Sequence, residues 1–139
     1  MEISTVAVIG AGTMGAGIAQ VCAQAGWETR LHDPFPESLA SGMASIESFW
    51  EKGVSLGKTS AEQKESWSAN LTDCSDLGEA VGDADLVIEA VPEDMDLKKK
   101  IFRSLEMMAP GHAILATNTS GLQISEIAGS TGCGERVIG

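Results

Sequence analysis

The sequence predicts an α/β fold, a doubly wound parallel sheet with a helical hairpin inserted between its second and third strands. Short apolar runs alternate with helical patterns along the chain, which is typical of parallel sheets that helices cover on both faces. A glycine cluster joins the first strand to the first helix. The segment after the second strand is longer than a plain crossover needs, and it carries the hairpin.

The first three elements form a β-α-β unit. Residues 3–9 are nearly all apolar and rich in β-branched side chains, as in a strand buried on both faces. Residues 14–25 have a helical pattern, and residues 28–32 form a second strand that Asp33-Pro34 ends.

Two helices are expected in the inserted segment. Residues 37–50 form an amphipathic helix that Gly53 closes, and residues 60–67 form a second helix antiparallel to it. The apolar side chains of the first helix recur at helical spacing, and they are Leu39, Met43, Ile46 and Trp50.

The rest of the chain continues the alternation. The expected elements are a weak strand at 70–73, a short helix at 76–81, a strand at 86–90, a helix at 93–108 and a strand at 113–116. Pro92 opens the long helix, and Pro110-Gly111 ends it. No internal repeat or linker interrupts the sequence, so we expect residues 1–139 to form one domain.

Composition and charge exclude several kinds of partner. The net charge is −11, whereas nucleic-acid binding draws on clustered Lys and Arg. The three cysteines are widely spaced and have no ligand set beside them, so we expect no metal site, no disulfide framework and a cytoplasmic location. No apolar run approaches the roughly 18 residues of a membrane span, and no targeting signal is recognised.

The glycine cluster predicts a dinucleotide site. It follows the first strand, opens the first helix and reads Gly10-Ala11-Gly12-Thr13-Met14-Gly15. In this GxGxxG pattern Gly10 allows a tight turn, Gly12 lets a pyrophosphate approach the backbone, and Gly15 lets helix and strand pack closely. The pyrophosphate then lies at the positive end of the helix. The alternative is a glycine turn without a ligand.

Asp33 favours NAD as that dinucleotide. It ends the second strand at roughly the 20-residue spacing expected for the acid that binds the adenosine ribose. Its charge would repel a 2′-phosphate, and Pro34-Phe35 offers no arginine to receive one, which argues against NADP. Two alternatives stay open. Asp33 could be an ordinary turn residue before proline, and FAD enzymes share the same glycines and acid.

Three runs give a more specific resemblance. In chain order they are VAVIGAGTMGAGIAQVCAQAG, IEAVPEDMDLKKKIF and ATNTSGLQISEIA. Together they resemble the NAD-binding domain of the 3-hydroxyacyl-CoA dehydrogenases, over essentially the whole chain and most weakly between 38 and 70. The resemblance implies an enzyme that interconverts (S)-3-hydroxyacyl-CoA and 3-ketoacyl-CoA with NAD, as a homodimer formed through a C-terminal domain. It also implies that the helical hairpin helps to hold coenzyme A.

The resemblance assigns residues around the nicotinamide ribose. Glu93 and Lys98 match family residues there, and Ala90 supplies nearby backbone. The alternative for both charged residues is ordinary helix chemistry, because acids favour a first helical turn and i,i+4 ion pairs are common on helices. Lys99 and Lys100 are expected to face solvent.

The segment Thr117-Asn118-Thr119-Ser120 follows the strand at 113–116, at the carboxyl edge where α/β folds bind ligands. The resemblance implies that Asn118 and Ser120 contact the cofactor. It also makes Ser120 a catalytic group that hydrogen-bonds the reacting oxygen. No base adjoins Ser120 in the sequence, so a nucleophilic serine is not indicated. The alternative is that both side chains satisfy loop backbone.

The chain departs from the family pattern in the hairpin. Phe49 and Leu56 stand where better-known members have a Ser and a Lys that contact coenzyme A, with Ser48, Lys52 and Lys58 as nearby substitutes. The acyl-carrier contact therefore stays open.

A second departure concerns the catalytic histidine. In the family it follows a segment like residues 135–139, so we expect it, and the glutamate that holds it, beyond Gly139. His32 and His112 cannot replace it, since one precedes the ribose acid and the other starts a strand at its amino end. Both are expected to be ordinary, partly exposed histidines.

Two other functions fit the same residues. One is an NAD-dependent dehydrogenase of a small 3-hydroxy acid or a carnitine-like substrate, and the other is an NAD-binding module without catalysis. A histidine shortly after residue 139 would favour an enzyme, and its loss would favour the module.

Overall fold

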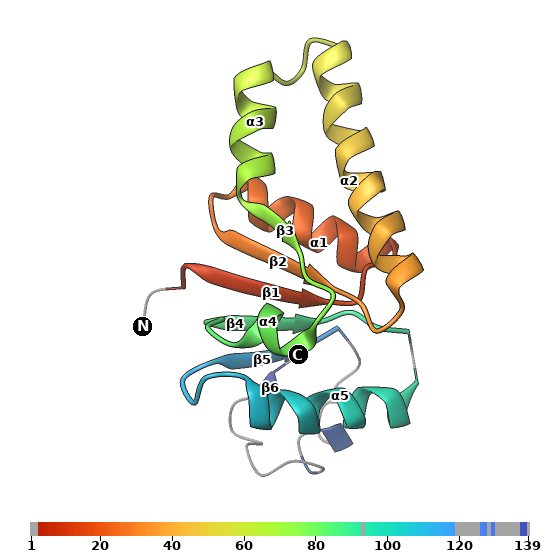
Figure 1. The fold of residues 1–139 in the computed structure, drawn as a ribbon, viewed down its shortest axis with the longest axis vertical. Helices are drawn as coiled ribbons and strands as arrows, with labels where there is room; N and C mark the ends of the chain where they lie inside the picture. Colours follow the sequence, from red (N-terminus) through yellow and green to blue (C-terminus); the bar gives the residue numbers. More distant parts are fainter. Residues whose placement is uncertain (1–2, 93, 119–125, 128, 130–136, 139) are drawn as a thin grey trace.

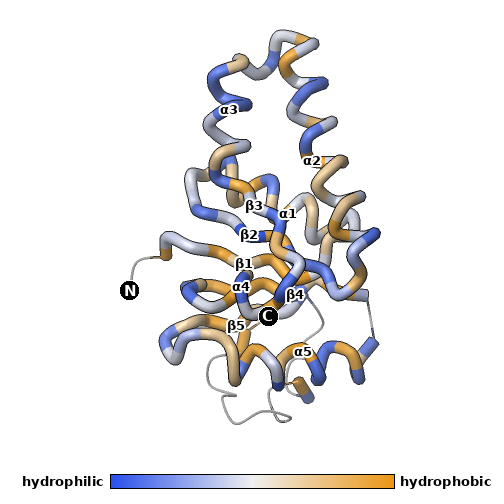
Figure 2. Tube along the Cα trace, in the orientation of Figure 1, coloured by the Kyte–Doolittle hydropathy of each residue, from blue (hydrophilic) through white to orange (hydrophobic). Residues whose placement is uncertain are grey.

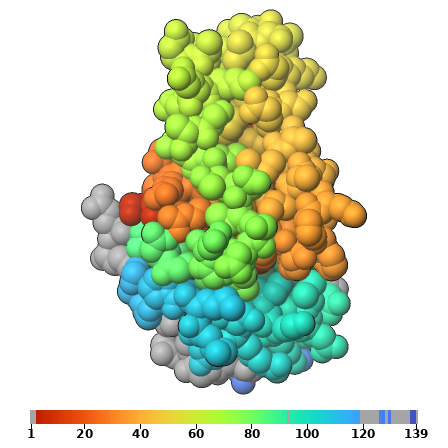
Figure 3. All heavy atoms as spheres, viewed as in Figure 1, coloured from red at the N-terminus to blue at the C-terminus, as the bar shows by residue number. Residues whose placement is uncertain are grey.

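The computed structural model describes residues 3–92, 94–118, 126–127, 129 and 137–138. Within these ranges the chain forms a parallel sheet with helices on both faces and a helical arm that stands away from it (Figures 1 and 3). No helix in the described ranges is both long and apolar enough to cross a membrane.

The sheet has six parallel strands in the order β3-β2-β1-β4-β5-β6. Their bounds are Thr5–Ile9 for β1, Glu28–His32 for β2, Leu71–Asp73 for β3, Leu86–Glu89 for β4, Ile114–Thr117 for β5 and Val137–Ile138 for β6. This order reverses between β1 and β4, which makes their carboxyl ends the expected ligand crevice. The predicted fold is confirmed, and β6 is an addition that sequence reasoning did not assign.

Five helices have both of their ends within the described part of the chain, and residues 126–127 and 129 are also helical. The five are α1 (Thr13–Gln24), α2 (Pro36–Ser55), α3 (Ala61–Ala69), α4 (Leu77–Val81) and α5 (Met95–Met108). Side chains alternate along β1, so that Val6 and Val8 pack under α1 and α2, whereas Ala7 and Ile9 pack under α4 and α5. Both faces of the sheet are therefore buried, and the apolar residues gather there (Figure 2).

The arm consists of α2 and α3, inserted between β2 and β3 as predicted. Trp50 and Trp67 bring the two helices together with ring centroids 5.9 Å apart. The predicted end of α2 was wrong, because the helix passes Gly53 and continues to Ser55. Gly57 adopts the left-handed conformation that commonly follows a helix, with φ of 73°.

The start of α5 also differs from the prediction. The helix begins at Met95 rather than directly after Pro92. Asp94 occupies the N-cap position, where its Oδ1 accepts a hydrogen bond from the backbone N–H of Leu97 at 3.2 Å. An aspartate in that position satisfies one of the unpaired donors of the first helical turn, and this fixes the helix start.

Candidate functional site

The glycine loop joins β1 to α1 at the carboxyl edge of the sheet. Gly10 has φ of 110° and donates its N–H to the carbonyl oxygen of His32 at 2.7 Å. A Cβ atom at Gly10 would lie 2.7 Å from the backbone carbon and oxygen of Ala90. The loop thus packs directly against the segment that leaves β4, and only glycine combines that contact with that φ.

The other two motif glycines have different surroundings. A Cβ at Gly15 would lie 1.7 Å from the carbonyl oxygen of Gly10, so this glycine permits the close packing of α1 on the loop. A Cβ at Gly12 would meet no protein atom within 4 Å. Gly12 caps α1 without a side-chain hydrogen bond, which leaves open space beside the positive end of the helix.

Asp33 follows β2 and is only 7% exposed. Its Oδ2 accepts a hydrogen bond from the N–H of Ala11 at 2.7 Å, and its Oδ1 accepts one from the N–H of Phe35 at 2.8 Å. The hydrogen bond from Phe35 is the interaction expected if Asp33 were an ordinary turn residue before proline. The hydrogen bond from Ala11 ties the carboxylate to the glycine loop, and each oxygen retains capacity for a further donor.

A cavity of about 360 Å³ lies over these residues. Its lining comes from the glycine loop, from Asp33 and Phe35 after β2, from α2, and from the segments after β4 and β5. The lining residues are Gly10, Gly12, Thr13, Met14, Asp33, Phe35, Ser38, Ala90, Val91, Pro92 and Asn118. The structure therefore brings most of the predicted cofactor residues to one cavity.

The chemistry of this cavity fits a dinucleotide without a 2′-phosphate. Gly12 leaves a cradle that a side chain would partly fill, and the buried carboxylate of Asp33 borders the same space. None of the described lining residues is an arginine or a lysine. The cavity thus has space that fits a pyrophosphate and a carboxylate that fits a ribose, and its described lining offers no cation to receive an additional phosphate.

Sequence reasoning missed a buried polar network below this cavity. Glu89, the last residue of β4, has no exposed surface. Its carboxylate accepts hydrogen bonds from the N–H of Val91 at 2.7 Å, from Oγ1 of Thr117 at 2.5 Å and from Nζ of Lys98 at 2.8 and 3.0 Å. A charged residue at the end of an apolar run is the only sequence signal for it.

Lys98 is 1% exposed, so its ammonium group is a buried charge rather than a surface one. Besides Glu89, its Nζ lies 3.4 Å from the carbonyl oxygen of Val91, which lines the cavity. Lys99 is half-buried and pairs with Glu126 at 2.6 Å, so the prediction that it faces solvent was wrong. Lys100 is exposed as predicted.

Two predicted site residues, Glu93 and Ser120, lie outside the described residues. The histidines have no role in the cavity. His32 is buried, contrary to prediction, and its Nδ1 lies 2.9 Å from the carbonyl oxygen of Cys74. His112 is exposed at the amino edge of the sheet, where its Nε2 lies 2.8 Å from Oδ1 of Asp85.

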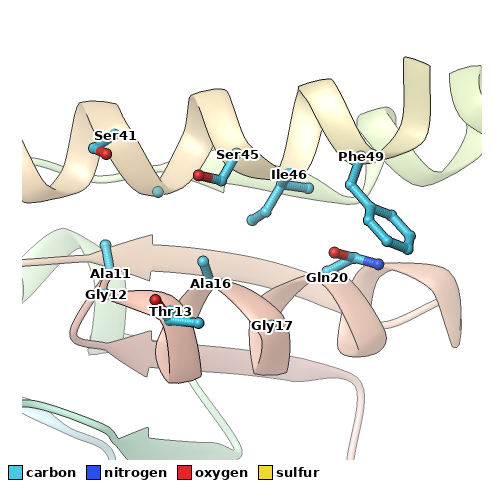
Figure 4. Close-up of a pocket in the computed structure, with 11 residues that line it drawn as sticks. Ala11, Gly12, Thr13, Ala16, Gly17, Gln20, Ser41, Ser45, Ile46 and Phe49 are labelled. Carbon is cyan, nitrogen blue, oxygen red and sulfur yellow. The ribbon is translucent and has the colours of Figure 1, made fainter. Parts of the chain in front are cut away.

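A second cavity of about 350 Å³ lies between α1 and α2 and shares Gly12 and Thr13 with the first. Figure 4 shows Phe49 reaching from α2 toward Gln20 on α1, with serines of α2 along the same groove. Gly42 brings α2 against the glycine loop, since a Cβ there would lie 2.5 Å from the carbonyl oxygen of Ala11. The arm is thereby anchored next to the first cavity.

Known proteins share this arrangement. Residues 5–139 match the family model described as "3-hydroxyacyl-CoA dehydrogenase, NAD binding domain". A probable 3-hydroxybutyryl-CoA dehydrogenase of Bacillus subtilis is 40% identical over all of this chain and 48% of its own length. The chain spans about half the length of this relative, or less in longer ones.

Solved structures agree. A 3-hydroxybutyryl-CoA dehydrogenase of Escherichia coli is 39% identical with a TM-score of 0.91, over 99% of this chain and 29% of that one. A diketoreductase is 35% identical with a TM-score of 0.84, over 99% of this chain and 49% of that one. The glycine loop, the parallel sheet and this match over nearly the whole sequence lead to one conclusion: the chain belongs to the NAD-binding domain family of the 3-hydroxyacyl-CoA dehydrogenases.

Proposed function

We propose that this chain holds NAD in an enzyme that interconverts (S)-3-hydroxyacyl-CoA and 3-ketoacyl-CoA. The observation that carries the proposal is the carboxyl-edge cavity, which joins the glycine loop and Asp33 to the ends of β4 and β5. Bound NAD would supply the acceptor for the hydride. The residues of this chain would bind and orient the cofactor, contact the reacting oxygen of the substrate through Ser120, and border a groove for the rest of the substrate.

Different residues of the cavity would contact different parts of the cofactor. The loop from Gly10 to Gly15, with Ala11, Thr13 and Met14, would surround the pyrophosphate at the start of α1. Asp33 would accept the adenosine ribose hydroxyls. Because the adenosine half then lies over β2, the nicotinamide half lies over β4 and β5, beside Ala90 and Asn118.

We assign Glu93, Lys98 and Ser120 to the same half. Lys98 lies below the cavity lining, within reach of the carbonyl oxygen of Val91. Glu93 and Ser120 rest on the family resemblance, which gives Ser120 a hydrogen bond to the reacting oxygen of the substrate. A hydroxyl donor at that position would stabilise charge that develops on the oxygen.

The proton transfer requires a base, and within the described part of this chain neither histidine lines the cavity. The two histidines of the chain are His32, buried against the carbonyl of Cys74, and His112, at the opposite edge of the sheet. We therefore assign the base to a histidine outside residues 1–139, as in the family. General acid-base assistance contributes about 10² to 10⁴-fold to such reactions.

The groove between α1 and α2 supports an acyl-CoA thioester as substrate. It opens next to the cofactor cavity and presents serine hydroxyls and the exposed ring of Phe49. Lys52 borders the adjoining face of α2 together with Ser48. An aromatic ring could stack on an adenine and a lysine could pair with a phosphate, although the family pattern has a Ser and a Lys at Phe49 and Leu56.

A second candidate is a dehydrogenase of a small hydroxy acid, carnitine-like or dicarbonyl substrate. The likeness to a diketoreductase favours it, because that protein shares this domain at 35% identity. An NAD-binding module without catalysis is the third. The substrate groove separates the candidates, since only the acyl-CoA enzyme needs coenzyme A to bind at Phe49.

We also propose a homodimer, formed outside residues 1–139, and a cytoplasmic location. The dimer rests on the family resemblance. The location is supported by Cys22 and Cys74, which are buried free thiols. Burial raises the pKa of both thiols, which keeps them protonated and unreactive.

The experiment is an NADH titration of the 139-residue protein followed by an absorbance assay with acetoacetyl-CoA. We expect NADH to bind and no measurable reduction of the thioester, because we assign the base and the groups that position the substrate to residues outside 1–139. Positioning alone can account for about 7 to 11 kcal/mol of barrier. Turnover that Ser120→Ala abolishes would show that the catalytic centre lies within this chain, and failure to bind NADH would refute the cofactor site.

A further inference from the structure

The carboxylate of Glu89 is fully buried. None of the binding contacts proposed above involves it. Glu89 lies at the carboxyl end of β4, and its backbone carbonyl accepts the N–H of Asn118 at 3.0 Å. Its side chain accepts hydrogen bonds from the segments that follow β4 and β5 and from α5, through Val91, Thr117 and Lys98. One carboxylate thus links three segments around one half of the cavity.

That half is the one expected to receive the nicotinamide. Asp33 and the glycine loop would fix the adenosine and pyrophosphate ends over β2 and β1. The lining that follows β4 and β5 includes Ala90, Val91 and Asn118. Val91 connects this lining to the network, since its N–H binds Glu89 and its carbonyl oxygen lies 3.4 Å from Nζ of Lys98. The buried charges are therefore joined through Val91 to the lining of the half expected to receive the nicotinamide.

Charge at this place acts differently on the two redox forms of the cofactor. The nicotinamide ring is positively charged in NAD⁺ and uncharged in NADH. A lysine ammonium below the ring would repel NAD⁺ alone, and both oxygens of Glu89 contact that ammonium at 2.8 and 3.0 Å. Because the pair is shielded from water, its charges act over a longer range than surface charges do.

We propose that Glu89 is a positioning residue that orients Lys98 and compensates its charge, and thereby sets the relative affinity of the site for NAD⁺ and NADH. The inference rests on the proposed cofactor site and adds a function to it. If Glu89 had a purely structural role, its loss would loosen the segments after β4 and β5. The binding of NAD⁺ and of NADH would then weaken equally.

The test compares dissociation constants for NAD⁺ and NADH in the wild-type protein and in Glu89→Gln, Lys98→Met and the double variant. Glu89→Gln keeps the shape and removes one negative charge that contacts the ammonium of Lys98, so the affinity for NAD⁺ should fall about tenfold relative to that for NADH, as a unit charge acting over about 10 Å at an effective dielectric of about 20 implies. Lys98→Met should shift the ratio the other way, and the double variant should restore it.

Two controls separate charge from geometry. Glu126→Gln removes one negative charge that pairs with the half-buried Lys99, the neighbouring lysine on α5, and it should leave the ratio of the two affinities unchanged. Thr117→Val removes one hydrogen-bond donor to Glu89 without changing any charge, and it should weaken both redox forms alike. Circular dichroism of each variant verifies folding before titration.

The outcomes are distinguishable. Opposite shifts in Glu89→Gln and Lys98→Met, with recovery in the double variant, would support the proposal. Equal weakening of both redox forms in the two single variants, or shifts of the same sign, would overturn it while leaving the cofactor site in place. If Glu89→Gln does not fold, Lys98→Met decides by the sign of its shift. A wild-type protein that binds neither form would overturn the cofactor site itself.

Discussion

Two buried carboxylates at the carboxyl edge of the sheet invite comparison. Asp33 follows β2 and Glu89 ends β4, and each accepts a hydrogen bond from the backbone N–H two residues later, Phe35 or Val91. Among the described residues, the other hydrogen bond that Asp33 accepts comes from the backbone N–H of Ala11, and its carboxylate borders the open cavity. Glu89 also binds a hydroxyl and the ammonium of Lys98, and has no exposed surface.

The comparison indicates two ways of building the proposed cofactor site. On the proposed adenosine side, glycine geometry and neutral backbone donors set the positions, and the carboxylate stays available to a ligand. On the proposed nicotinamide side, a buried ion pair links the segments behind the lining. The glycine loop should therefore be sensitive to substitutions that add side-chain atoms, and the buried ion pair to substitutions that remove a charge.

The largest expected effect comes from breaking the buried pair. Lys98→Met leaves the carboxylate of Glu89 without its ammonium, and losing one partner of a buried ion pair typically costs about 3–5 kcal/mol. Chemical denaturation measures this loss. Lys99→Met, on the same helix, breaks only a pair with the exposed Glu126 and should cost less than about 1 kcal/mol. Equal losses would remove the distinction between the two lysines.

Substitutions of the motif glycines should give the next largest effects. At Gly15 the effect should be on stability, and at Gly12 on NADH binding. Gly15→Ala forces a Cβ to 1.7 Å from a backbone oxygen, so unfolding should become easier by about 3 kcal/mol. Gly12→Ala has open space, so stability should change by less than about 0.5 kcal/mol, whereas NADH should bind about tenfold more weakly because the methyl group enters the pyrophosphate cradle.

Gly17→Ala serves as the matched control in the same helix. No atom lies within 4 Å of its added Cβ, and alanine is favoured over glycine inside helices by about 1 kcal/mol. It should stabilise the protein and leave NADH binding unchanged. If Gly12→Ala behaved like this control, the cofactor would not approach the loop as proposed.

A smaller loss is expected for Asp33→Ala. It removes a charged acceptor from the ribose hydroxyls, and hydrogen bonds to charged groups contribute about 1.5–3 kcal/mol, so NADH affinity should fall about 10 to 100-fold. Asp73→Ala, at the exposed end of β3, is the control. Fluorescence titration with NADH measures both, and similar affinities in the two variants would argue that Asp33 serves the turn alone.

The smallest effect lies at the opposite edge of the sheet and depends on pH. Hydrogen bonds from the N–H of Ser4, from His112 and from the N–H of Thr5 hold the pKa of Asp85 well below its usual value. A lowered pKa stabilises the fold above the unfolded-state value of about 4, and this contribution is lost as pH falls below it. Asp85→Asn should therefore flatten the decline in Tm between about pH 5 and pH 2, without affecting NADH binding.

Sequence reasoning correctly predicted that the glycine loop and Asp33 come together at the carboxyl edge, because these residues are close together in the chain. Gly10 to Gly15 and Asp33 flank a single β-α-β unit, and the structure brings them to one cavity. The alternation of apolar runs was likewise enough to predict the parallel sheet, since strands buried on both faces leave that pattern.

The network around Glu89 escaped prediction because its members are far apart in sequence. Glu89, Lys98 and Thr117 come from a strand, a helix and another strand, and nothing local marks them as partners. Lys98 was singled out only through the family resemblance, and its burial was not foreseen. The two-residue strand β6 is too short to leave a pattern, and the end of α2 depended on Gly57 rather than the nearer Gly53.

The most direct test of the cofactor site is a calorimetric titration of the wild-type protein with NADH and with NADPH. Asp33 borders the cavity, and none of the described lining residues is cationic, so a 2′-phosphate would meet a carboxylate without a counter-ion. We expect NADH to bind clearly more tightly than NADPH. Equal or tighter binding of NADPH would contradict the placement of the adenosine ribose at Asp33.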